Sequence, residues 1–207
     1  MEPYEDKLRR GGAPALIEAS RFFMRQDKVF ESLQRITRRL ADLRVPYAVA
    51  GGMALVAHGY DRTTVDVDIL LDAEGLARVH AELDGLGYVP PFKGSKHLRD
   101  VESSVRIEFL VAGQFPGDGK PKPVAFPNPR DVAVEIDGIQ FVDLPALIEL
   151  KLASGMTNPG RLKDLADVQE LIRVLKLPRD FDQQLNQYVR GKFVELWDAL
   201  SGSEQID

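Results

Sequence analysis

The 207-residue chain contains no cysteine and only three histidines, at positions 58, 80 and 97. The absence of thiols excludes a disulfide framework, a cysteine nucleophile, an iron–sulfur cluster and a zinc ribbon. The histidines are too scattered in sequence to indicate a multi-histidine metal site. Metal chemistry in this chain would therefore depend on carboxylates, which favours Mg²⁺ or Mn²⁺ as the ion.

Long apolar runs are also missing. No stretch approaches the roughly 20 apolar residues that cross a bilayer, and the first ten residues, MEPYEDKLRR, lack the apolar core of a signal peptide. We therefore expect a cytoplasmic protein without a membrane partner. Neither G-x-G-x-x-G nor a Walker A sequence occurs, so the two commonest nucleotide-binding motifs are excluded.

The composition that remains is that of a globular protein, with 44% apolar and 29% charged residues. The formal charge is −5. It is uneven, because residues 1–44 carry a net +3 and the remainder carries −8. Net acidity argues weakly against broad non-specific DNA binding. The acidic remainder is either a solvated surface, the more common case, or includes carboxylates that bind cations.

Periodicity and turn residues predict three regions: an N-terminal helical segment (1–44), a mixed α/β core (45–143) and a C-terminal helical region (144–207). Because the strands are not separated by regular crossover helices, a doubly wound Rossmann sheet is disfavoured. The Gly- and Pro-rich stretch 113–130 reads as a long exposed loop, and Asp137-Gly138 predicts a type I′ hairpin turn. The expected helices span 13–43, 53–59, 73–86, 144–155, 160–176 and 180–200, and the expected strands 45–50, 63–71, 104–111, 132–136 and 139–142.

A pair of carboxylates lies within an apolar strand. Asp66 and Asp68 alternate with Val65, Val67 and Ile69, so both acidic side chains point to the same face. Two like charges side by side on a largely buried strand are costly without a cation or a basic partner. Acidic-x-acidic triplets also occur elsewhere in the chain, so the strand context is what distinguishes this pair.

Two further features accompany that pair. Gly51-Gly52 follows a buried strand and precedes a helix, which is either a plain tight turn or a place where backbone amides approach a phosphate. Glu108 lies on the polar face of the expected strand 104–111. If the two strands pair, Glu108 would stand beside Asp66 and Asp68; otherwise it is an edge charge or a partner of Arg106.

Residues 48–71, AVAGGMALVAHGYDRTTVDVDILL, resemble the signature of the DNA polymerase β-type nucleotidyltransferase superfamily. That signature is a G-G or G-S turn, then D-x-D, then a third acidic residue on a later strand. The variant found in this chain is similar to bacterial, minimal nucleotidyltransferase-like proteins related to AbiEii toxins. Residues 147–171 resemble the family's helical motif through Lys151, Arg161, Lys163, Asp164 and Asp167.

The resemblance implies a mixed twisted sheet flanked by helices, with a C-terminal helical region closing over a nucleotide. It implies Asp66, Asp68 and Glu108 as catalytic ligands of Mg²⁺ (or Mn²⁺), and Gly51 and Gly52 as the cradle of the β- and γ-phosphates. The remaining nucleotide-binding candidates are basic or acidic side chains that would contact the triphosphate, orient it or reach the base. They are Arg62, Lys151, Lys163, Asp164 and Asp167.

These candidates also have a purely structural alternative. In that alternative, Lys151 and Lys163 are solvated helix charges, and Asp164 and Asp167 pair locally with Arg161 and Lys163. Two departures from the family bear on turnover: Met53 stands where many active members carry serine, and the third carboxylate is glutamate rather than aspartate. His58 flanks the glycine turn and would either contact substrate or cap a helix.

Two hypotheses follow. The first is an enzyme that transfers a nucleoside monophosphate from a nucleoside triphosphate to a hydroxyl of a protein, a tRNA or a small molecule, within a toxin–antitoxin system or outside one. The second is a module of the same fold that binds nucleotide with weakened turnover, or acts as an antitoxin with a partner protein. A third, plainer reading is a structural domain with surface acidic pairs.

Overall fold

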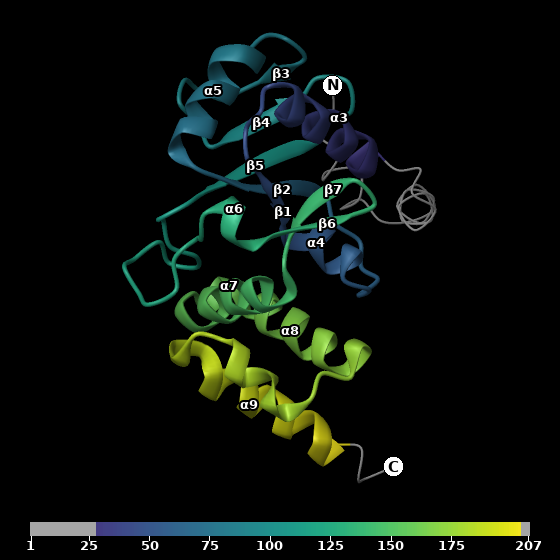
Figure 1. The fold of residues 1–207 in the computed structure, drawn as a ribbon, viewed down its shortest axis with the longest axis vertical. Helices are drawn as coiled ribbons and strands as arrows, with labels where there is room; N and C mark the ends of the chain where they lie inside the picture. Colours follow the sequence, from purple (N-terminus) through teal and green to yellow (C-terminus); the bar gives the residue numbers. More distant parts are fainter. Residues whose placement is uncertain (1–27, 204–207) are drawn as a thin grey trace.

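A seven-stranded mixed sheet organises residues 28–203, the part of the chain that the computed structural model describes (Figure 1). Its strand order is β3-β4-β5-β2-β1-β7-β6. The pairs β1–β7 and β2–β5 are parallel, and the other neighbours are antiparallel. The strands are β1 (Ala48–Ala50), β2 (Asp66–Leu71), β3 (Tyr88–Val89), β4 (His97–Asp100), β5 (Arg106–Val111), β6 (Ala133–Ile136) and β7 (Ile139–Val142).

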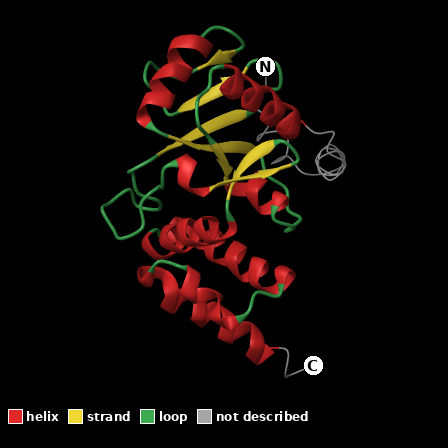
Figure 2. Cartoon of the chain, viewed as in Figure 1, coloured by secondary structure: helices red, strands yellow, loops and turns green. Residues whose placement is uncertain are grey.

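The helices fall into two groups (Figure 2). One group surrounds the sheet: α3 (Lys28–Asp42), α4 (Gly51–Ala57), α5 (Ala73–Leu83) and the short α6 (Pro129–Val132). The other forms a helical layer at one end of the molecule: α7 (Leu144–Thr157), α8 (Leu162–Leu175) and α9 (Gln187–Ser203), with 3-10 turns η1 (Pro159–Arg161) and η2 (Arg179–Gln184). The observed order matches the expected sequence of a helix, a mixed centre and a helical end.

The first described helix shows how burial positions the sheet. Val29, Leu33, Ile36 and Leu40 recur at spacings of three and four and are fully buried in α3, which contacts β2. This stripe is the apolar face of an amphipathic helix. The expected helix over 13–43 is thus confirmed for 28–42, and its residues 13–27 lie outside the described part of the chain.

The two strands that carry the acidic residues pair directly. β2 and β5 run parallel, with Asp66 opposite Arg106 and Asp68 opposite Glu108. In β5 every second side chain is buried, so Glu108 lies on the more accessible face as expected. β5 begins at Arg106 rather than at the expected Ser104, because Ser104 adopts φ 62°, a left-handed conformation that a strand cannot contain.

The glycine pair differs from the expectation. Helix α4 begins at Gly51, so the two glycines form its first turn instead of a separate break before it. Gly51 has φ +58°, a conformation that glycine adopts without steric cost. The chain can therefore pass from β1 into α4 with no connecting residues.

The remaining expectations are largely confirmed. Asp137 and Gly138 both have positive φ, as a type I′ turn between β6 and β7 requires. The segment 88–103 contains the two short strands β3 and β4, which lie outside the expected strand ranges. The expected helix over 180–200 is split into η2 and α9, because Leu185 between them is extended.

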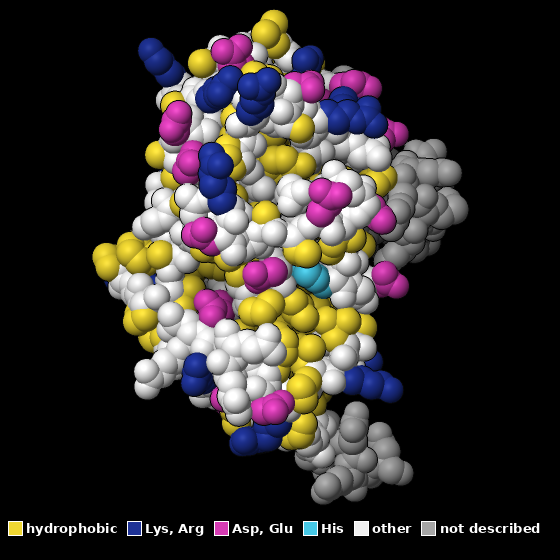
Figure 3. Space-filling view, in the orientation of Figure 1, with side chains coloured by type: hydrophobic (Ala, Val, Ile, Leu, Met, Phe, Trp, Pro, Cys, Tyr) yellow, Lys and Arg dark blue, Asp and Glu magenta, His cyan; other side chains and the backbone are white. Residues whose placement is uncertain are grey.

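None of the helices within residues 28–203 combines the length and apolar character needed to cross a bilayer. On the face shown in Figure 3, acidic and basic side chains are scattered over the sheet region, and hydrophobic side chains gather over the helical layer. Charge of one sign does not dominate this face.

Candidate active site

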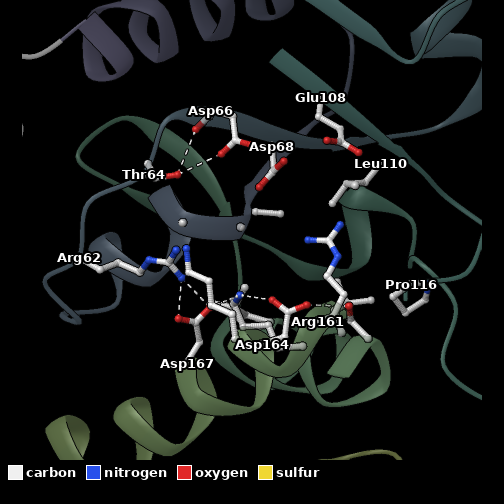
Figure 4. Close-up of a pocket in the computed structure, with 18 of the residues that line it drawn as sticks. Arg62, Thr64, Asp66, Asp68, Glu108, Leu110, Pro116, Arg161, Asp164 and Asp167 are labelled. Carbon is white, nitrogen blue, oxygen red and sulfur yellow. Dashed lines mark hydrogen bonds and ion pairs between the residues drawn. The ribbon is translucent and has the colours of Figure 1, made fainter. Parts of the chain in front are cut away.

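A pocket of about 330 Å³ lies between the sheet and the helical layer. The carboxylates of β2 and β5 reach it from one wall, and side chains of α7, η1 and α8 reach it from the opposite wall (Figure 4). All ten site residues expected from the sequence line this single pocket: Gly51, Gly52, Arg62, Asp66, Asp68, Glu108, Lys151, Lys163, Asp164 and Asp167. Elements more than a hundred positions apart in the sequence therefore contribute to one site.

The Asp66 and Asp68 carboxylates lie side by side on β2 (Figure 4). The Thr64 hydroxyl donates to Oδ1 of Asp66 at 3.1 Å. Burial, together with the negative charges of Asp66 and Glu108, raises the pKa of Asp68 to about 7, against the opposing effects of Lys151 and Arg161. A carboxylate in this state is stabilised by any cation that joins the pair.

The third carboxylate already has basic neighbours. Glu108 accepts a hydrogen bond from Nη2 of Arg106, and its Oε1 lies 3.5 Å from Nε2 of His97 on the adjacent strand β4. Arg106 is thus a direct partner of Glu108, one of the two readings that the sequence left open. The register with Asp68 places Glu108 beside the aspartate pair at the same time, which was the other reading.

The donor set fits a divalent cation in part. Asp66 and Asp68 present hard oxygen ligands on one face, which suits Mg²⁺ or Mn²⁺. In the side-chain conformations of residues 28–203, however, no group of three or more histidine and acidic residues is arranged to hold an ion. Glu108 would have to turn from Arg106 and His97 to join the pair.

The glycine turn is pressed against these acidic side chains. A Cβ atom on Gly51 would lie 1.7 Å from Oδ2 of Asp68, and one on Gly52 would lie 2.5 Å from Oγ1 of Thr64. Only glycine fits at both positions without displacing a neighbour. Met53 is a core residue with 5% exposure. Thr64, in the loop just before β2, brings a hydroxyl to this turn.

A buried ion-pair network joins the loop before β2 to the helical layer. Nη1 of Arg62 donates to both carboxylate oxygens of Asp167, at 2.5 and 2.6 Å. Nζ of Lys151 donates to Asp167 at 2.7 Å and to Asp164 at 3.0 Å, and Oγ of Ser154 donates to Asp164 at 2.6 Å. Lys151 is 8% exposed and Asp167 3%.

This network bears on the alternatives left open for the C-terminal motif. Asp164 and Asp167 do not pair locally with Arg161 and Lys163, and the buried Lys151 is not a solvated helix charge. Lys163 is exposed, although partial desolvation and the nearby Arg62 lower its pKa. Arg161 and Lys163 line the pocket and take part in no ion pair within residues 28–203. Figure 4 shows the Arg161 side chain projecting from the helical wall toward the carboxylates.

His58 lies elsewhere. Its Nε2 is 2.8 Å from the carbonyl oxygen of Val142, and it is the C-cap residue of α4. The capping alternative thus describes it better than substrate contact, since His58 does not line the pocket.

The sequence alone did not identify several residues that line the pocket. Thr64 lies within the signature-like run 48–71 but was not singled out there, and Ser154 is an isolated hydroxyl residue whose role depends on long-range packing. The loop between β5 and α6 contributes Pro116, Gly117 and Phe126. Its richness in glycine and proline was the available signal, but that pattern does not indicate which side chains turn inward.

That loop is held in place by a buried lysine. Nζ of Lys122 donates to the carbonyl oxygen of Pro116 and to Asp118, both at 2.5 Å, and to Oγ1 of Thr157 on α7 at 3.3 Å. The Lys122 side chain is only 5% exposed. Asn158 also donates to the carbonyl oxygen of Gly117 at 3.2 Å. The loop is therefore fixed against the helical layer and forms a stable wall of the pocket.

Comparison with known proteins supports the fold. No protein-family model matches the chain. The chain is 27% identical over 195 residues to the fatty acid synthase subunit alpha of Emericella nidulans, covering 93% of this chain but only 11% of that protein. Among solved structures, the antibiotic-resistance factor ANT(2'')-Ia in solution aligns with a TM-score of 0.53 and 15% identity, over 84% of this chain and 96% of that one. Its crystal structure with adenylyl-2''-tobramycin aligns with the same TM-score and identity, over 79% and 95%. The expected fold, a mixed α/β nucleotidyltransferase fold with a helical C-terminal region, is thereby confirmed.

Proposed function

We propose that this chain binds a nucleoside triphosphate with Mg²⁺ or Mn²⁺ and transfers its nucleoside monophosphate group to a hydroxyl acceptor. The observation that carries the proposal is the row formed by the glycine turn, the aspartate pair and Glu108 across neighbouring strands, facing the basic residues of the helical layer. The solved structure of similar fold that holds adenylyl-2''-tobramycin supports it, because nucleotide and acceptor parts are joined in that ligand.

The polar end of the pocket suits the triphosphate. The backbone of Gly51 and Gly52 allows close approach of phosphate oxygens, and Lys151 and Arg62 supply positive charge next to this turn. Asp164 and Asp167 hold those two cations in position. Lys163, at the exposed rim, adds a further cation for the nucleotide.

Asp66 and Asp68 would hold the divalent ions, with Glu108 as the third ligand after it leaves Arg106. When bound, such ions polarise the phosphoryl oxygens and lower the pKa of an attacking hydroxyl. The acceptor oxygen forms a bond to the α-phosphorus, the bond from that phosphorus to the bridging oxygen breaks, and pyrophosphate leaves. The hydroxyl proton passes to solvent. Little acid–base chemistry is required of the protein itself.

The test is incubation of the protein with α-labelled nucleoside triphosphates, Mn²⁺ and candidate acceptors, with pyrophosphate release and label transfer as readouts. The double variant Asp66→Asn/Asp68→Asn should lose at least about a thousandfold in transfer, comparable to loss of a major transition-state contact. The matched control is Glu135→Gln/Asp137→Asn, an acidic-x-acidic pair on the β6–β7 hairpin outside the pocket. Equal activity and equal nucleotide affinity in wild type and the Asp66/Asp68 variant would refute the proposal.

A second candidate is a nucleotide-binding module without turnover. The favouring observation is that Glu108 is engaged by Arg106 and His97, not by the aspartate pair. Calorimetry with each nucleoside triphosphate and Mg²⁺ separates the two functions. Tight binding without pyrophosphate release supports the module, whereas steady release supports the enzyme.

The biological setting we propose is a cytoplasmic toxin–antitoxin pair of the AbiEii-like type, with a partner protein. It rests on the resemblance of residues 48–71 to that branch of the superfamily. Growth arrest on expression of the wild type, but not of the Asp66→Asn/Asp68→Asn variant, is the expected result. Equal growth with both would argue for a role outside such systems.

A further inference from the structure

The order of residues across the sheet assigns a direction to the proposed reaction. Ala50, the residue before Gly51, is the register partner of Asp68, and Asp68 is the register partner of Glu108. These three residues occupy adjacent strands β1, β2 and β5, which are spaced by about 4.8 Å. The glycine turn, the aspartate pair and Glu108 therefore follow one another along a line across the sheet.

In-line phosphoryl transfer places the attacking oxygen opposite the leaving group. If pyrophosphate leaves from the side of Gly51 and Gly52, the acceptor hydroxyl enters from the side of Glu108. The side chains of the pocket wall beyond Glu108 would then contact the acceptor and select its chemical class.

That part of the wall carries apolar side chains next to Arg161. Leu110 follows Glu108 by two positions and points to the same face of β5, and Pro116 and Phe126 come from the loop that Lys122 holds. Pro116 is buried, and Leu110 and Phe126 are partly buried. Figure 4 shows Leu110 and Pro116 on the Glu108 side of the pocket, away from Arg62 and Asp167.

The charges of the pocket disfavour a polycation. Among the described residues that line it, Glu108 is paired with Arg106, Asp164 with Lys151, and Asp167 with both Lys151 and Arg62. Only the Asp66–Asp68 pair remains, and the metal ions of the proposed function would occupy it. An acceptor with several ammonium groups would meet unpaired Arg161 and Lys163 and no free carboxylate.

We propose that the acceptor hydroxyl is carried by an uncharged apolar or aromatic group that packs on Leu110, Pro116 and Phe126, and that the pocket rejects polycationic acceptors such as aminoglycosides. The inference rests on the proposed function and adds the class of its second substrate. Phe126 is a specificity residue in this scheme, because it touches the body of the acceptor and not the reacting atoms.

The experiment uses the full-length protein with Mn²⁺ and a mixture of the four α-labelled nucleoside triphosphates, after calorimetry has established nucleotide binding. The acceptor probes are N-acetyltyrosinamide, the smaller N-acetylserinamide, tobramycin and an oligoribonucleotide with a free 3′-hydroxyl. We expect transfer to N-acetyltyrosinamide to exceed that to N-acetylserinamide by roughly tenfold or more, the discrimination typical of an apolar subsite. Tobramycin should accept no label, and the oligoribonucleotide should accept less than N-acetyltyrosinamide.

Phe126→Ala should raise the KM for N-acetyltyrosinamide roughly tenfold, with unchanged nucleotide affinity, and Phe126→Leu should restore most of the loss. Phe92→Ala is the matched control, because Phe92 is 66% exposed and outside the pocket. Labelling of tobramycin, preference for N-acetylserinamide or the oligoribonucleotide, or use of another acceptor without use of N-acetyltyrosinamide would overturn the inference alone. Nucleotide binding without transfer to any acceptor would favour the module without turnover over the proposed transferase. Failure to bind any nucleotide would overturn the proposed function first, and this inference with it.

Discussion

Arg62 and Asp167 lie 105 positions apart in the sequence, and one guanidinium nitrogen of Arg62 donates to both carboxylate oxygens of Asp167. Lys151 donates to the same carboxylate at 2.7 Å. Two cations thus share one almost completely buried anion, which fixes the loop before β2 to helices α7 and α8. The stability of the whole pocket depends on this shared charge.

Replacement of Asp167 by alanine should therefore be strongly destabilising. It leaves Lys151 buried beside Asp164 alone and removes the partner of Arg62. Loss of one member of a buried ion pair costs about 3–5 kcal/mol. Urea unfolding followed by circular dichroism would measure the free energy of unfolding.

The control is Glu170→Gln, which removes the surface partner of Arg173 on the same helix. Because that pair is exposed to solvent, its loss should leave the unfolding free energy nearly unchanged. Equal effects of the two substitutions would contradict the structural role given to Asp167.

The raised pKa of Asp68 predicts a pH dependence of stability in metal-free protein. The ordinary pKa of the group is 3.8 and the folded-state pKa is about 7, so the folded state binds the extra proton between these values. The contribution of Asp68 to the free energy of unfolding is therefore favourable below about pH 4. It declines as the pH rises through 7, and above pH 7 it is fully unfavourable. Asp68→Asn should be more stable than wild type at pH 8 in the presence of a chelator, and should lose this advantage at acidic pH.

Divalent cations should favour the ionised form of Asp68 and so oppose the effect of the proton on stability. Mn²⁺ competes with the proton at Asp68, so its apparent affinity should increase from pH 5 to pH 8, and it should stabilise wild type but not Asp68→Asn at pH 8. Thermal unfolding at several pH values with and without Mn²⁺ checks both statements. A stabilisation by Mn²⁺ that persists in Asp68→Asn would place the ion elsewhere.

Gly51→Ala should disrupt the site both by backbone strain and by steric overlap with a neighbouring side chain. Its φ of +58° costs a side-chain-bearing residue about 1–2 kcal/mol, and its Cβ would also overlap the Asp68 carboxylate. Gly119→Ala is the matched control, since Gly119 has φ +72° with no atom within 4 Å of the added methyl group. Gly51→Ala should lose more stability than Gly119→Ala, and only Gly51→Ala should lose Mn²⁺ binding. Equal losses would show that backbone strain accounts for the whole effect.

Lys122→Met tests whether the loop between β5 and α6 is held by its buried ammonium. Removal of the hydrogen bonds to Pro116 and Thr157 leaves acceptors without partners, at a cost of about 1–3 kcal/mol. Amide hydrogen exchange in residues 112–128 should increase markedly, with little change in β2. Lys120→Met, an exposed position in the same loop, should leave the exchange rates unchanged.

Local patterns accounted for much of the fold. The alternation of Ile107 and Phe109 with Glu108 defined the strand and its faces, and Asp137-Gly138 defined the hairpin, because these signals depend on a few neighbouring residues. Ser104 in a left-handed conformation and Leu185 in an extended one end or divide elements for reasons that their residue types do not reveal.

The spacing of Asp66 and Asp68 and the family-like motifs predicted a set of site residues, and the structure brings all of them to one pocket. The sequence could not show that Asp164 and Asp167 would bind cations from other elements. Pairing across 13 to 105 positions is decided by how the helical layer packs on the sheet. The position of Pro116 likewise depends on the buried Lys122, whose residue type normally indicates exposure.

The parallel register of β2 and β5 also limits which insertions and deletions these two strands can tolerate. Insertion or deletion of one residue within 66–71 or 106–111 would exchange the two faces of that strand. Val67 or Ile107 would then project into the pocket, and the carboxylates would enter the apolar core. The residue count of these two segments is therefore as strictly limited as their chemistry, whereas the exposed tip of the neighbouring loop around Gly119 can lengthen without moving Asp66, Asp68 or Glu108.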